Sequence, residues 1–230
     1  MRKFANISIV ALAAVALAAS ATAAYEGQIR VEQGNWQTGT GGEFRVVPLS
    51  GFAGLTGLPA DQNASTFQTF CIQTGEQIRF NGVYDYNKNV VTVAGGQPLT
   101  PQVAYLYTQF RGGTLDATAH GAANPYRFAG TNAERQADAG QLQQALWFLM
   151  GQGGANNAYV ALANAAVSGP NPVWAGIGQV RILNLFNGAP NNPPAPWNNQ
   201  DVLTLIPVPG AALLGVLGLG LTGWIKRRMA

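Results

Sequence analysis

Hydrophobic and polar residues alternate in much of the first half of the chain. The alternation is clear in 28–32 and 44–47, and a strand-like run covers 67–80. A period of two is typical of strands with one buried face. The pattern predicts a strand-rich first half, with a hairpin in which 82–85 pairs with 90–93.

The second half changes to helical patterns. Thr100, followed by proline, and Asn132 are expected N-caps. The predicted helices cover 101–110, 133–150 and 156–167. The segment 173–186 fits either a helix or a strand. We therefore predict an α+β fold, with an antiparallel sheet in the N-terminal half and a small helical layer packed against it.

The N-terminus has the pattern of an export signal. Arg2 and Lys3 precede an apolar stretch over 7–19 and a small-residue site, Ala-Thr-Ala, at 21–23. These are the three parts of a secretory signal peptide. We expect signal peptidase to remove residues 1–24, and we expect the folded extracytoplasmic domain to span 25–188.

The C-terminal region begins with a segment rich in proline and asparagine. Proline fixes φ and removes a backbone donor, so we expect 189–205 to be an extended linker. Beyond it, Pro207 and Pro209 precede an uncharged apolar run that is just long enough to span a bilayer as a helix. The chain then closes on the basic residues Lys226, Arg227 and Arg228. By the positive-inside rule this basic end stays in the cytoplasm.

The tail over 206–230 resembles the PEP-CTERM sorting signal of Gram-negative bacteria, in its Pro-x-Pro motif, hydrophobic span and basic end. Val208 stands where that family usually has Glu. The resemblance implies processing by exosortase, a membrane protease-transpeptidase, after an inner-membrane intermediate. The protein would then reach the cell surface or the extracellular matrix. A plain single-pass anchor, never cleaved, is the alternative.

Charge and rare residues exclude several classes of function. The chain has 13 Lys and Arg against 10 Asp and Glu, and five of the basic residues lie in the two terminal segments. The remainder has 13 − 5 = 8 basic residues against 10 acidic ones, so we expect no nucleic-acid partner. One Cys and one His argue against a disulfide framework or a zinc site, and we expect no metal and no cofactor.

An enzyme is the least favoured class. A secreted hydrolase would have to use His120, the only histidine, and no serine lies in a G-x-S-x-G motif. We therefore expect a protein that is not an enzyme, and we keep the hydrolase as a weaker alternative.

The only thiol, Cys71, lies in the strand-like run Phe-Cys-Ile at 70–72. A helical segment, Gln-Gln-Ala-Leu-Trp, follows at 143–147. At about 100° per residue, Gln143 lies at the edge of the apolar stripe of this helix, whereas Gln144 points toward solvent. If either glutamine meets the cysteine strand, the spacing predicts Gln143.

These two segments resemble the thioester domains of bacterial surface adhesins. Leu142 stands where that family usually has Thr. The resemblance implies an internal bond between Cys71 and Gln143, open to attack by an amine, and hence covalent adhesion to an exopolysaccharide or an amine-bearing surface polymer. A buried, unreactive Cys71 is the alternative, because free cysteine is among the most buried residue types.

Overall fold

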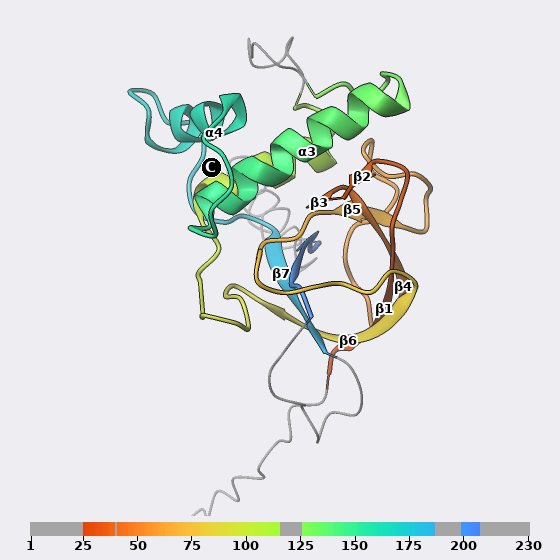
Figure 1. Ribbon diagram of the computed structural model, residues 1–230. Helices are drawn as coiled ribbons and strands as arrows, with labels where there is room; N and C mark the ends of the chain where they lie inside the picture. The colour runs from red at the N-terminus through yellow and green to blue at the C-terminus, as the bar shows by residue number, and fades with distance from the viewer. Residues whose placement is uncertain (1–24, 40, 116–125, 187–198, 208–230) are drawn as a thin grey trace, which may run out of the picture.

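In the computed structural model of the protein, the described residues are 25–39, 41–115, 126–186 and 199–207 (Figure 1). The predicted signal peptide, His120, Pro209 and the basic end at 226–228 lie outside them. Within these ranges, no helix is long and apolar enough to cross a membrane.

Six strands form one antiparallel sheet in the spatial order β5-β4-β1-β6-β7-β8. Their bounds are β1 Gly27–Glu32, β4 Phe44–Ser50, β5 Phe67–Thr69, β6 Gly82–Asn89, β7 Val180–Phe186 and β8 Val202–Leu205. A second, two-stranded sheet pairs β2 (Gln37–Thr38) with β3 (Gly41–Gly42). The predicted antiparallel, α+β class is confirmed, but the sheet is not confined to the N-terminal half, because β7 and β8 come from the C-terminal half.

The two edges of the large sheet meet. Just after β5, the Ile72 N–H donates to the Asp201 carbonyl at 3.2 Å, and the Leu203 N–H donates to the Phe70 carbonyl at 3.3 Å. Cys71 and Val202 form the bridge between these bonds. An open edge would leave such backbone groups unpaired. The sheet therefore closes on itself, and Cys71 lies at the closing seam.

Alternation along the strands fills the closed sheet. In β1, Ile29 and Val31 are buried while Gln28 and Arg30 are not. The same period of two brings inward residues of all six strands of the large sheet into one cluster. Its members include Ile29, Val31, Phe44, Val46, Phe67, Cys71, Tyr84, Tyr86, Leu183, Leu185 and Val202, together with Trp147 from a helix.

Three helices, α1 (Pro101–Arg111), α3 (Asn132–Leu149) and α4 (Ala158–Ser168), gather on one side of the sheet (Figure 1). Outward residues of β7 and β8, among them Ile182 and Leu203, join the helices in a second hydrophobic cluster. The predicted helices are thus confirmed to within two residues. Thr131 replaces Asn132 as N-cap of α3, because Thr131 and Glu134 form a reciprocal capping box.

Two sequence predictions are wrong. The hairpin between 82–85 and 90–93 does not form, because β6 continues to Asn89 and pairs with β1 and β7. The linker predicted over 189–205 does not include its last residues, because β8 is buried in the sheet. Val202, Leu203 and Leu205 supply hydrophobic contacts that outweigh the polar composition around them. The ambiguous segment 173–186 contains strand β7.

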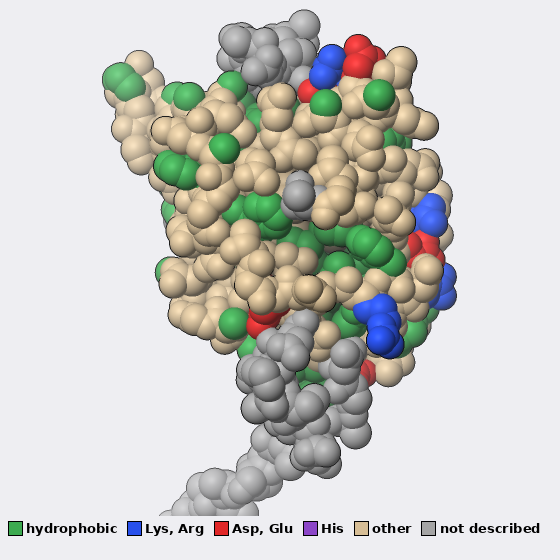
Figure 2. Space-filling view, viewed as in Figure 1, with side chains coloured by type: hydrophobic (Ala, Val, Ile, Leu, Met, Phe, Trp, Pro, Cys, Tyr) green, Lys and Arg blue, Asp and Glu red, His purple; other side chains and the backbone are tan. Residues whose placement is uncertain are grey.

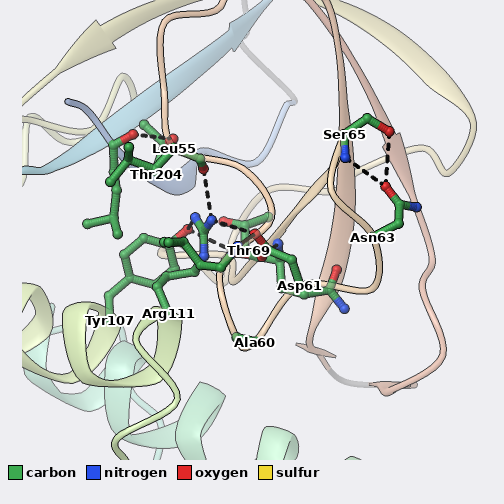
Figure 3. A network of polar contacts seen from close by, with 12 residues as sticks. Leu55, Ala60, Asp61, Asn63, Ser65, Thr69, Tyr107, Arg111 and Thr204 are labelled. Atoms are coloured by element: carbon green, nitrogen blue, oxygen red, sulfur yellow. Dashed lines mark hydrogen bonds and ion pairs between the residues drawn. The ribbon is translucent and has the colours of Figure 1, made fainter.

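One end of the seam is held by a buried ion pair (Figure 3). The Arg111 Nη2 lies 2.9 Å from the Asp61 Oδ2, and both side chains are fully buried. Arg111 also donates to the Tyr107 hydroxyl, which in turn donates to the carbonyls of Gln68 and Leu203. Helix α1 is thereby bonded to the strands on both sides of the seam.

Candidate functional site

The structure brings Cys71 and Gln143 together at the other end of the seam. The Cys71 N–H donates to the Gln143 Oε1 at 3.2 Å, and the Gln143 Nε2 donates to the Cys71 carbonyl at 2.6 Å. Both residues are fully buried. The carboxamide of Gln143 is therefore held, by two bonds, against the residue that carries the thiol.

A second glutamine contacts the thiol itself. The Cys71 Sγ donates to the Gln200 Oε1 at 2.7 Å, and the Gln200 Nε2 donates to the Gln73 carbonyl. Gln200 lies next to β8, in the segment that the sequence assigned to the linker. It contacts Cys71 across 129 positions of the chain, and local sequence pattern offers no signal for such a contact.

Close packing fixes Gln143 from the opposite side. Gly41 in β3 has a φ of +132°, and a Cβ there would lie 2.6 Å from the Gln143 Cγ and 3.1 Å from the Trp147 Cη2. A side chain at this position would thus overlap the Gln143 chain and strain the backbone. The glycine allows the β2–β3 pair to approach α3 closely enough to cover the site.

The electrostatic environment keeps the thiol protonated. Burial, reinforced by the nearby Asp201 carboxylate, raises the pKa of Cys71 well above its ordinary value. Burial also raises the pKa of Asp201 to about 7. The Asp201 carboxylate accepts from the Val93 and Leu185 N–H groups and the Asn184 amide, and none of these partners is charged. A thiol in such surroundings is a poor nucleophile toward outside reagents.

A cavity of about 350 Å³ adjoins the site. Its lining combines Phe44, Phe80 and Trp147 with the polar side chains of Glu76 and Gln200. Cys71 and Gln143 are not part of the lining. Figure 2 shows that charged side chains are sparse on the face below α3 and that hydrophobic ones gather near its centre.

The other residues singled out from the sequence lie apart from this site. Gln144 is half-buried and lines a different cavity, beside Gly140 and Asn157. Pro207 is exposed at the end of the described segment that follows β8. In the parts of the chain that the structure describes, no three His, Cys, Asp or Glu side chains group closely enough to hold a metal ion.

No protein-family model matches this sequence, and the comparisons with curated proteins and with solved structures return no match either. The geometry of the chain itself therefore carries the functional argument.

The arrangement offers one kind of chemistry. A thiol and a carboxamide lie on adjoining elements in a buried environment, next to a cavity. If the sulfur attacks the Gln143 amide carbon, the C–N bond breaks and ammonia leaves with the thiol proton, so that a thioester forms. Burial would protect the thioester from hydrolysis.

Proposed function

We propose that this protein is exported to the cell surface or extracellular matrix and attaches covalently to amine-bearing polymers through a thioester between Cys71 and Gln143. The observation that carries the proposal is the pair of hydrogen bonds that hold the Gln143 carboxamide at Cys71. Both bonds go to the Cys71 backbone, and they hold the carboxamide of a residue 72 positions away beside the residue that carries the thiol.

The chemistry of attachment follows from the bond. An amine adds to the thioester carbonyl, the C–S bond breaks, and the amine nitrogen forms an amide with the former Gln143 side chain. The proton that the amine loses returns to the Cys71 sulfur, so a free thiol appears as the adduct forms. No cofactor is consumed, and the chain reacts once rather than turning over, which distinguishes an adhesin from an enzyme.

The intact mass of the purified full chain tests the bond. With a thioester, the chain weighs one ammonia less than its processed sequence, and its only thiol resists alkylation even after denaturation. Methylamine should then add to the chain and release the thiol. Full calculated mass with a freely alkylated thiol in denaturant would leave the alternative, a buried unreactive cysteine.

Matched variants assign the bond to its residues. Cys71→Ala and Gln143→Ala should each abolish the methylamine adduct, whereas Gln144→Ala should leave it intact, because Gln144 lies outside the site. An adduct that survives Gln143→Ala would assign the acyl group to another residue.

The export half of the proposal rests on the two ends of the chain. The signal peptide expected over 1–24 and the PEP-CTERM-like tail over 206–230 support release by signal peptidase and sorting by exosortase in a Gram-negative cell. Replacing Pro207 and Pro209 should trap full-length protein in the inner membrane. Wild-type protein that also stays there at full length would identify the tail as a plain single-pass anchor.

A further inference from the structure

Gln200 stands between the cavity and the thiol. The residue is 8% exposed and belongs to the cavity lining, while its Oε1 accepts from the Cys71 Sγ at 2.7 Å. Cys71 itself is fully buried and does not reach the cavity. A molecule in the cavity therefore meets the Gln200 carboxamide before it meets the sulfur.

Gln200 is also held so that it can be displaced without breaking the sheet. Among the described residues, its side chain bonds only to Cys71 and to the Gln73 carbonyl. The pairing of the segment depends instead on backbone bonds, such as the one from the Gln200 N–H to the Gln77 carbonyl. Rotation of this side chain costs two hydrogen bonds and leaves the seam intact.

The cavity has unpartnered polar atoms of its own. Two residues of its lining carry them: the Trp147 indole N–H and one carboxylate oxygen of Glu76 are buried and have no hydrogen-bond partner among the described residues. Only 9% of Trp147 is exposed. Buried polar groups usually find partners, so an unpaired donor and an unpaired acceptor beside one cavity point to a bound ligand. A carboxylate among aromatic rings favours a cationic group.

We propose that this cavity is the entrance to the Cys71 site, that Glu76 binds the ammonium end of the incoming molecule, and that Gln200 closes the route until it is displaced. This proposal rests on the proposed function for its chemistry, but the route can be tested whether or not the thioester forms. In the reaction, the Glu76 carboxylate takes one proton from the ammonium group, and the resulting amine attacks the thioester.

The test measures how fast Cys71 reacts with two methanethiosulfonate reagents of equal size, one positively and one negatively charged. The full chain is first treated with methylamine, which opens a thioester if one is present and leaves a free thiol unchanged. Every sample then carries a free Cys71, so a failure of the thioester does not affect the measurement. The mass of the untreated chain reports the thioester separately.

Each residue has its own expected effect. Gln200→Ala should raise the rates of both reagents at least about tenfold, because the shield over the thiol is removed. Gln200→Leu should keep the thiol slow, since it fills the same space. Glu76→Gln should lower the preference for the cationic reagent severalfold without raising either rate. Gln144→Ala, on the other side of α3, should match wild type.

Thermal unfolding of each variant separates the route from general loosening. If Gln200→Ala reacts at the wild-type rate, Gln200 is not the gate. Equal acceleration by Gln200→Leu and Gln200→Ala would show loss of structure rather than opening of a route, and would overturn the gate as well. An unchanged charge preference in Glu76→Gln would remove Glu76 from the proposal.

Discussion

The two ends of the seam between β5 and β8 are built from different chemistry. At one end, Arg111 and Asp61 neutralise each other, and the Tyr107 hydroxyl bonds to both strands (Figure 3). At the other end, Cys71 is surrounded by the carboxamides of Gln143 and Gln200, with no cation among its hydrogen-bond partners.

The two sets of contacts suit different roles, one structural and one chemical. A buried charge pair is costly to disturb because either partner alone is stranded in a low dielectric. Neutral amides can exchange partners at a lower cost. The carbonyl carbon of an amide, unlike the carbon of a guanidinium, can also become the acyl group of a thioester. The first end therefore suits a permanent clamp, and the second suits a site that must admit another molecule from the adjoining cavity.

The largest effect is expected at the clamp. Arg111→Met leaves the Asp61 carboxylate buried without its cation, which should lower the free energy of unfolding by about 3–5 kcal/mol in a urea titration. The control, Arg30→Ala, removes a partly exposed pair with Glu32 and should cost no more than about 1 kcal/mol. Similar urea midpoints for the two variants would mean that the buried pair of Arg111 and Asp61 stabilises the fold no more than the partly exposed pair does.

The next effect is a pH dependence at the reactive end. Because burial raises the pKa of Asp201 to about 7, the folded chain holds a proton that the unfolded chain loses near its ordinary value of 3.8. The Asp201 contribution to the free energy of unfolding is therefore greatest below pH 3.8, and it falls as the pH rises from there to about 7. Asp201→Asn removes this contribution.

The measurement compares wild type and Asp201→Asn by urea unfolding at about pH 4.5 and about pH 8. The variant should gain stability relative to wild type at the higher pH. Glu43 also has a pKa raised by burial, but it is present in both proteins and cancels in the comparison. If the difference in free energy of unfolding between wild type and Asp201→Asn is the same at both pH values, the pKa of Asp201 is not raised in the folded chain.

A smaller loss is expected at Gly41. Gly41→Ala strains a backbone with φ +132° and pushes a methyl group against the Gln143 Cγ, for a cost of about 1–3 kcal/mol in the free energy of unfolding. Gly39→Ala is the matched control, because a Cβ there meets nothing within 4 Å. Faster alkylation of Cys71 in the Gly41 variant alone would further localise the damage to the site.

The smallest effect is expected at Gln144. This side chain is half-buried and takes no part in the Cys71 contacts, so Gln144→Ala should change the free energy of unfolding by no more than about 0.5 kcal/mol. Urea titration is again the measurement. A loss comparable to that of Gly41→Ala would mean that Gln144 supports the site as well as Gln143.

Much of the local structure could be predicted from the sequence. Alternation at 28–32 and 44–47 and the cap at Thr100 located two strands and a helix correctly. Helical spacing also predicted which glutamine faces inward, and Gln143 is fully buried while Gln144 is not. These features depend on neighbours within one or two turns, and such neighbours are visible in the chain itself.

The sequence by itself therefore determined the three helices, the strands β1 and β4, and which of Gln143 and Gln144 turns toward the core. Only the tertiary structure decided that β6 pairs with β7 rather than with 90–93, and that the segment at 199–205 enters the sheet. It also placed Gln200 on the Cys71 thiol and Asp201 beside it. Strand pairing between distant segments is chosen by the packing of the whole core, and no local pattern encodes it.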